Sequence, residues 1–170
     1  MPEIQYLTLA FYRHQGRFFD RLIRLITRSP YSHVELVLSS GVQMSSDQDW
    51  RLYSLSSSLR DGGVRIKIIH YEVGKWEFVQ LENWSKTHDG VWLTARQYVG
   101  QPYDILGIMF NFMVPIRRQL RRSWFCSELC GHALGIKHPH TLSPGDLFDQ
   151  VQQLNKAYLC GRLDGHINDV

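Results

Sequence analysis

A cysteine at the start of a predicted helix is the residue of this sequence best suited to covalent chemistry. After Cys126, apolar residues recur at helical spacing, and Gly135 stands where a left-handed C-terminal cap is expected. We expect Ser123 or Ser127 to cap the start of this helix. A thiol there lies at the positive end of the helix dipole, close to unpaired N–H groups, and both favour the nucleophilic thiolate. The apolar positions are Leu129, Ala133 and Leu134.

A histidine on a predicted strand supplies the base that such a thiol needs. The segment 31–38 alternates as a strand does, so His33, Glu35 and Val37 share one face. The opposite face is fully apolar, with Val34, Leu36 and Leu38. A cysteine at a helix start and a histidine on a strand are the pair that a cysteine hydrolase uses, and such residues meet in space however far apart they lie in sequence.

Two other interpretations of the same residues remain open. In the first, Cys126 is a buried, inert thiol and the chain is a binding module without catalysis. The second is a structural zinc site, because five possible ligands are close in sequence: Cys126, Cys130, His132, His138 and His140. The Cys-x3-Cys spacing fits zinc loosely, but the two last histidines are too close together for the usual His pair. We therefore expect no metal and no other cofactor, and we place Cys130 in the core.

Length and composition predict one ordinary globular domain over residues 1–170. Hydrophobic residues make up 44% and charged residues 21% of the sequence, and the formal charge of +3 is too small to indicate a nucleic-acid partner. Three cysteines without paired spacing argue against a disulfide framework and favour a reducing compartment. The N-terminus lacks a signal-peptide pattern, and the longest apolar stretch, 105–116, is shorter than the about 20 residues that cross a bilayer. These features predict a cytoplasmic protein.

Strands dominate the first half of the chain and helices the second. Segments that alternate as strands do, at hairpin-like spacing, are 4–12, 31–38, 42–44, 64–71 and 76–81. The polar segment 45–58 is expected to be a loop. Segments with helical periodicity are 91–99, 105–113, 126–134 and 144 onward. Ser143 and Asp146 predict a capping box for the last helix. The sequence therefore predicts an α+β fold, with an antiparallel sheet or open barrel packed against helices.

One further helix, predicted at 17–28, is strongly amphipathic. Its apolar stripe consists of Phe18, Leu22, Leu25 and Ile26. Another face carries a row of arginines, namely Arg17, Arg21, Arg24 and Arg28. Such a row is either a solvated face or a contact with an anionic surface or substrate, and we expect Arg21 and Arg24 to make that contact. Together with the apolar segment 105–113 and the arginines of 117–122, it leaves a lipid-directed acyltransferase or lipase at an anionic membrane as an alternative function.

Four short motifs together resemble the NlpC/P60 superfamily of papain-like cysteine hydrolases. They are Ser32-His33-Val34-Glu35, Gly100-Gln101-Pro102-Tyr103, Phe125-Cys126-Ser127-Glu128 and Ser143-Pro144-Gly145-Asp146-Leu147. The superfamily usually places its histidine strand after its cysteine helix, whereas His33 precedes Cys126 here. This order is similar to the circularly permuted branch, which includes the YiiX/YaeF-like proteins and the lecithin retinol acyltransferase-like enzymes. The resemblance implies a permuted papain-like fold.

The resemblance also implies acyl transfer through a thioester. Cys126 would attack an amide, isopeptide or ester carbonyl, His33 would move the proton, and water would release the acid. The backbone N–H of Cys126 would stabilise the oxyanion, with the hydroxyl of Tyr103 as a second donor. The implied substrate is a peptide or acyl compound, with cell-wall stem peptides among the peptides.

The residue that orients the imidazole ring of His33 has two candidates. The superfamily usually takes this residue from the next strand, where the present sequence has Met44-Ser45-Ser46. Ser45 or Ser46 therefore competes with Glu35, which shares the face of His33. A carboxylate on this strand is costly to bury unless it has a partner, so Glu35 is the preferred candidate.

Overall fold

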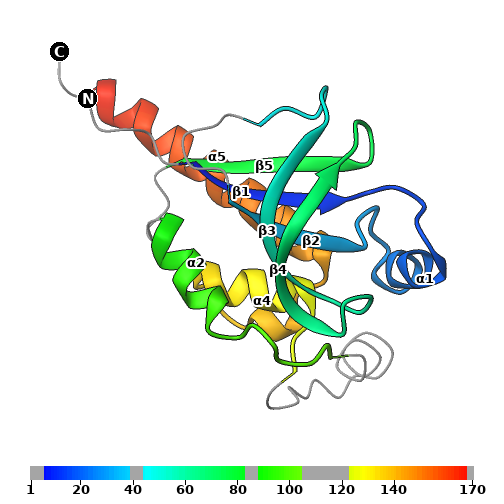
Figure 1. Cartoon of the computed structure of the whole chain (residues 1–170). Coiled ribbons are helices and arrows are strands. Elements are labelled where there is room, and N and C mark those ends of the chain that lie inside the picture. The colour runs from blue at the N-terminus through cyan, green and yellow to red at the C-terminus, as the bar shows by residue number, and fades with distance from the viewer. Residues whose placement is uncertain (1–5, 39–43, 83–87, 105–122, 168–170) are drawn as a thin grey trace.

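A five-stranded antiparallel sheet forms the centre of the protein, and its architecture is α+β, as predicted (Figure 1). The computed structural model describes residues 6–38, 44–82, 88–104 and 123–167. In order across the sheet, the strands are β4 (Gly63–Tyr71), β3 (Trp50–Ser58), β2 (His33–Val37), β1 (Tyr6–Tyr12) and β5 (Trp76–Glu82). Each neighbouring pair is antiparallel, which agrees with the hairpin-like spacing of the sequence.

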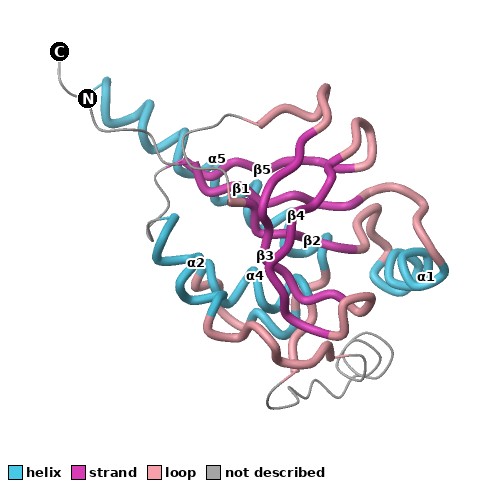
Figure 2. The backbone as a smooth tube through the Cα atoms, viewed as in Figure 1, coloured by secondary structure: helices cyan, strands magenta, loops and turns pink. Residues whose placement is uncertain are grey.

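Among the described residues, three α-helices cover one face of the sheet and a fourth lies to one side (Figures 1 and 2). The covering helices are α2 (His88–Arg96), α4 (Cys126–Leu134) and α5 (Pro144–Ile167), with a short 3-10 helix, η1 (Pro139–Thr141), between the last two. The predicted capping box of α5 is confirmed. Ser143 Oγ accepts the N–H of Asp146 at 3.1 Å, and the Asp146 carboxylate accepts the N–H of Ser143 at 2.9 Å.

The two faces of the sheet carry different apolar clusters. On the helix-covered face, alternate strand residues such as Leu9 and Leu36 pack in one core with Leu129 of α4. On the other face, the ring of Tyr71 in β4 lies 4.9 Å from that of Trp76 and 5.4 Å from that of Phe78, both in β5. Because β4 and β5 are the two edges of the sheet, these contacts mean that the sheet is strongly curled, as Figure 1 shows for β3 and β4.

The prediction of a loop over 45–58 is wrong in its second half, which is β3. Serines fill the end of this strand, and they are buried because their hydroxyls have partners. Ser56 donates to the carbonyl of Val34 at 2.6 Å, and Ser57 donates to the carbonyl of Trp124 at 2.6 Å. Composition indicates polarity, but it does not reveal that each hydroxyl meets an acceptor inside the fold.

The predicted helix at 17–28 is confirmed as α1 (Phe18–Thr27), but its apolar stripe does not face the core. None of the residues of α1 is buried, and the side chains of Phe18 and Leu25 are 73% and 76% exposed. Figure 2 shows α1 beyond the ends of β1 and β2, away from the other helices. The apolar stripe of α1 is therefore not covered by any of the described residues.

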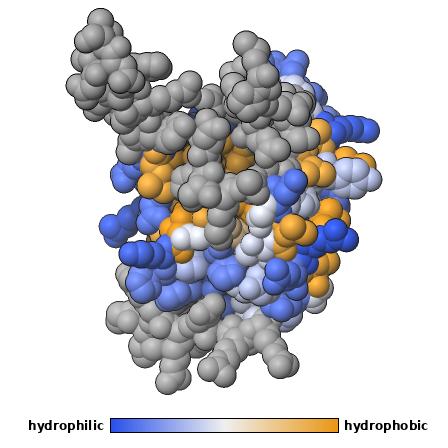
Figure 3. All heavy atoms as spheres, turned by 90° about the vertical axis from the view of Figure 1, so that its left-hand side faces the viewer, coloured by the Kyte–Doolittle hydropathy of each residue, from blue (hydrophilic) through white to orange (hydrophobic). Residues whose placement is uncertain are grey.

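On the side of the molecule away from α1, none of the described helices exposes an apolar stripe like that of α1. Hydrophobic side chains lie there among hydrophilic ones, over α2 and α5 (Figure 3). In the described ranges, no helix is long and apolar enough to cross a membrane. The predicted elements at 42–43, 105–113 and 117–122 lie outside the described residues.

Candidate active site

The site forms where β2 separates from β3. The two strands pair through Leu36–Leu55 and Val37–Ser54, and His33 lies beyond this pairing at the start of β2. The segment before α4 is fastened in this region, because Ser57 of β3 donates to the carbonyl of Trp124. The first residue of α4 is thereby brought to the first residue of β2.

Cys126 is the first residue of α4, as the sequence predicts, but no serine caps the helix. The N-cap is Phe125, whose backbone is extended and whose side chain makes no capping hydrogen bond. Ser127, one of the predicted caps, instead donates to the carbonyl of Leu142 at 2.7 Å and ties α4 to the start of α5. The orphan N–H groups at the start of α4 are therefore not covered by a capping side chain. Gly135 ends the helix at φ 80°, which confirms the predicted C-cap.

His33 contacts both of its expected partners. Its Nε2 donates to Glu35 Oε1 at 2.7 Å, and the Cys126 side chain is close enough for its charge to act on the ring. Because Nε2 is taken by the carboxylate, Nδ1 is the nitrogen available to the sulfur. Burial opposes protonation of the ring, but the negative charges of Cys126 and Glu35 outweigh it and raise the pKa of His33 to about 10. The ring of His33 therefore keeps its proton at neutral pH.

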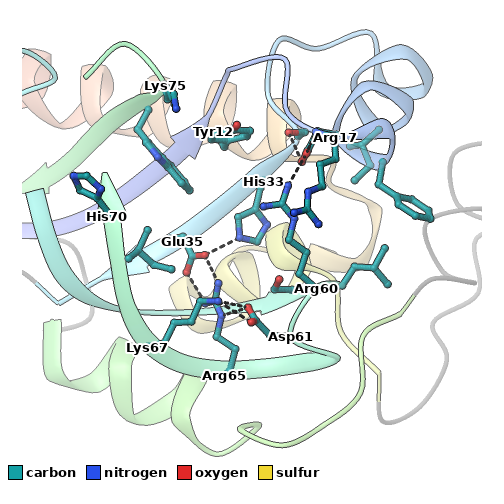
Figure 4. Close-up of a pocket in the computed structure, with 18 of the residues that line it drawn as sticks. Tyr12, Arg17, His33, Glu35, Arg60, Asp61, Arg65, Lys67, His70 and Lys75 are labelled. Carbon is teal, nitrogen blue, oxygen red and sulfur yellow. Dashed lines mark hydrogen bonds and ion pairs between the residues drawn. The ribbon is translucent and has the colours of Figure 1, made fainter. Parts of the chain in front are cut away.

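Glu35 is held by two cations at once. Beside its bond from His33, it accepts two hydrogen bonds from Arg65 of β4, at 2.7 Å on Oε2 and 2.5 Å on Oε1. Burial by itself would raise the pKa of Glu35, but the bonds from Arg65 and the charge of His33 lower it. Arg65 is fixed in turn by Asp61, which accepts from its Nε at 2.9 Å and also binds Lys67. Figure 4 shows this chain of alternating charges running away from His33.

Tyr103 is placed beside Cys126 by the turn that contains it. The N–H of Tyr103 donates to the carbonyl of Gly62 at 3.2 Å, and the N–H of Val64 donates to the carbonyl of Gln101 at 2.9 Å. This approach requires glycine at position 63, because a Cβ there would lie 2.1 Å from the carbonyl oxygen of Gln101. Burial and the charge of Cys126 raise the pKa of Tyr103 well above its usual value, so its hydroxyl keeps its proton.

A cavity of about 510 Å³ lies in front of these residues. His33, Glu35 and Tyr103 line it, whereas Cys126 does not and is 2% exposed. The cavity is therefore lined by His33 and Tyr103, two residues whose pKa values are raised by the charge of Cys126, and not by the cysteine itself. Figure 4 shows the guanidinium groups of Arg17 and Arg60 reaching into the cavity next to His33.

The other residues predicted for the site are not brought to it. Ser45 and Ser46 are exposed, the hydroxyl of Ser45 bonds the Asp47 carboxylate, and neither serine lines the cavity. The serines lie in the loop before β3 and not on a strand beside His33, and the secondary role of Ser46 stays a prediction. Of the two candidates for the orienting residue, Glu35 is the one that hydrogen bonds with His33.

Arg21 and Arg24 also lie away from the cavity. Arg24 donates to the backbone carbonyls of Arg13 and Gln15, at 3.2 and 2.9 Å, so it fastens the connection between β1 and α1. Contact of Arg24 with a substrate or an anionic surface stays a prediction. Arg21 is exposed on the outer side of α1.

Sequence reasoning missed two cations of the cavity, Arg60 and Arg65, as parts of the site. A signal existed for Arg65, because strand alternation places it with Lys67 on the polar face of β4. No sequence pattern indicates that this face meets Glu35, since β4 and β2 are not neighbours in the sheet. For Arg60, in the turn between β3 and β4, we find no sequence signal.

The second cysteine of α4 does not share the surroundings of the first, because it lies one turn further from the start of the helix. Cys130 is buried one turn later, as predicted, and burial raises its pKa well above the usual value. In the described ranges, no three His, Cys, Asp or Glu side chains are grouped so that they could hold a metal ion.

Comparison with models of known protein families gives no match to this chain, and comparison with curated proteins gives none either.

Proposed function

We propose that the chain is a cysteine-dependent acyl hydrolase of the circularly permuted NlpC/P60 type, cleaving an amide or isopeptide bond through a thioester. The observation that carries the proposal is the position of His33, whose Nε2 donates to Glu35 and whose pKa is raised by the charge of the nearby Cys126. A nucleophile, a base and a group that orients the base are the three parts of a thiol hydrolase site.

The order of the elements supports the permuted form of that site. His33 begins β2, and β2 precedes α4 in the chain, with β3, β4, β5 and α2 between them. The Gly-x-Pro-Tyr turn pairs with the segment just before α4, through the bridge between Tyr103 and Trp124. Three of the four motifs that carry the resemblance, those of His33, Tyr103 and Cys126, thus lie close together although they are spread over the sequence, which supports the proposal.

In the proposed reaction, the Cys126 thiolate attacks the carbonyl carbon and the carbonyl oxygen becomes an oxyanion. The backbone N–H of Cys126 and the hydroxyl of Tyr103 donate to that oxygen. The imidazolium of His33 gives its proton to the leaving amine, which departs and leaves a thioester. Water then gives a proton to His33 and its oxygen to the thioester carbonyl, which releases the carboxylic acid and restores the thiolate–imidazolium pair.

Thiol reactivity distinguishes this hydrolase from a binding module built on the same fold. The chain is treated with iodoacetamide at neutral pH, and peptide mass mapping follows the label with time. We expect Cys126 to react first and His33→Ala to slow it at least about tenfold, because the thiolate loses its counter-ion. Cys130 is the internal control, as a buried thiol on the same helix. Faster labelling of Cys130 or Cys160, or a rate unaffected by His33→Ala, would contradict the proposal.

Acyl transfer itself is tested with an activated acyl ester, p-nitrophenyl acetate. We expect a burst of p-nitrophenolate and a mass increase of one acetyl group on Cys126, both absent in Cys126→Ser. An amide and an ester of the same acyl group, assayed in parallel, then separate a peptidase from an acyl-ester hydrolase. If iodoacetamide labels Cys126 but no acyl-enzyme forms, the thiol is reactive and the proposed hydrolase activity is contradicted.

A further inference from the structure

α1 presents an apolar surface with no partner in the described chain. Phe18, Phe19 and Leu25 are the most exposed of its apolar side chains, and Leu22 and Ile26 lie on the same side at helical spacing. A helix with so strong a separation of polar and apolar residues ordinarily turns its apolar stripe toward the core. Contiguous exposed apolar surface of this kind marks an interaction site.

The polar side of α1 is what holds the helix to the protein. Asp20 accepts the N–H of Arg17 at 2.7 Å and a bond from Arg60 at 3.1 Å, and it also accepts the hydroxyl of Ser32 at 3.3 Å. Arg24, on the same side, binds backbone carbonyls of the preceding loop. Because these bonds fix the polar side inward, the apolar stripe is fixed outward.

Two arginines border the stripe along one edge. Arg21 and Arg28 fall within about 20° of each other around a helix of 3.6 residues per turn. Both are exposed, and among the described residues neither forms an ion pair with an acidic side chain. The outer side of α1 therefore combines apolar side chains with a line of uncompensated positive charge.

We propose that α1 docks the protein on the surface of a bilayer that contains anionic lipids. Phe18, Leu22 and Leu25 would enter the boundary between headgroups and acyl chains, while Arg21 and Arg28 bind lipid phosphates. A bilayer suits this surface better than a protein partner does. α1 stands out from the sheet as a ridge, and a bilayer yields around a ridge, whereas a protein would need a preformed acidic groove (Figure 1).

Docking through α1 would set the orientation of the cavity as well. Phe19, Asp20 and Ile23 of α1 line the cavity in front of His33. A helix lying in the lipid surface therefore places the mouth of the cavity next to that surface. The inference does not rest on the proposed hydrolase, because binding to vesicles is measured without any reaction.

The test is co-sedimentation of the full chain with vesicles of phosphatidylcholine, with and without one third phosphatidylserine. We expect binding to the anionic vesicles that weakens as salt is raised. Phe18→Ser/Leu25→Ser and, separately, Arg21→Gln/Arg28→Gln should each weaken it at least about tenfold. Both pairs are exposed, so circular dichroism and the melting temperature should match those of the unchanged protein.

Matched substitutions elsewhere on the surface serve as controls. Leu93→Ser/Leu154→Ser removes two exposed leucines from α2 and α5, and Arg96→Gln/Lys137→Gln removes two exposed positive charges. Both controls should bind vesicles like the unchanged protein. The proposal is overturned if the protein stays in the supernatant, if the controls lose as much binding as the α1 variants, or if Phe18→Ser/Leu25→Ser instead dissolves a dimer seen without lipid.

Discussion

α4 and α1 are helices of nearly equal length that relate to the protein in opposite ways. α4 buries all of its residues except His132, whereas α1 buries none. α4 is only weakly amphipathic, because the sheet, α2 and α5 surround it, while the strongly amphipathic α1 turns its apolar stripe to solvent. Amphipathicity therefore shows that a helix has an apolar face that needs a partner, but it does not show which partner covers that face.

The sharpest test of the comparison is to shorten one leucine in each helix. Leu129→Ala in α4 should lower the free energy of unfolding by about 2–5 kcal/mol, because Leu129 is fully buried and its loss leaves a cavity. Leu25→Ala in α1 should change it by less than about 0.5 kcal/mol. Urea denaturation measures both. A comparable loss for Leu25→Ala would mean that the stripe of α1 packs within the protein.

The next test asks whether the chemistry belongs to the α4 side of the molecule. Glu35→Gln keeps the shape of the side chain but removes the charge that orients and stabilises the imidazolium. The acylation rate with p-nitrophenyl acetate should fall about ten- to a hundredfold, or about 1.4–2.7 kcal/mol of transition-state stabilisation. Ser46→Ala, in the exposed loop, is the control and should react like the unchanged protein. Normal activity in Glu35→Gln with a loss in Ser46→Ala would reverse the assignment of the orienting residue.

A smaller effect concerns the titration of His33, which NMR follows through the ring protons. Its pKa should lie near 10 in the unchanged protein and fall by at least about one unit in Cys126→Ser, because the thiolate is the strongest charge raising it. Since the folded pKa exceeds the unfolded value of about 6.5, the stability contributed by His33 is complete below that pH. It is then lost as the pH rises toward 10. A His33 that titrates near 6.5 would contradict the ion pair.

Much of the scaffold could be predicted because periodicity reports directly on secondary structure. Alternation located β1, β2, β4 and β5, and Gly135 located the end of α4. The meeting of Cys126 with His33 was also predicted, since a thiol at a helix start and a base on a strand belong to one kind of site. These inferences need only the residue types and their spacing.

The remaining features depend on contacts between distant parts of the chain. β3 was mistaken for a loop because its serines find acceptors that lie in other elements. The bond from Arg65 to Glu35 joins strands that are not neighbours, so no local pattern contains it. The outward stripe of α1 depends on how Asp20 and Arg24 hold the helix. To predict any of these features, one must know where the partner residue lies in space, which the sequence pattern of a single segment does not contain.

The contact between His33 and Cys126 makes proton affinity depend on the acylation state of the protein. The negative charge on Cys126 is the largest of the effects that raise the pKa of His33. In the proposed reaction, the sulfur loses that charge as soon as it bonds to the carbonyl carbon, and His33 would then hold its proton less tightly. The imidazolium would therefore be a stronger acid when the tetrahedral intermediate collapses and the leaving group needs a proton. Release of the acyl group would restore the charge on the sulfur, and His33 would again hold a proton tightly. Formation and cleavage of the covalent bond would thus decide when His33 acts as an acid and when it acts as a base.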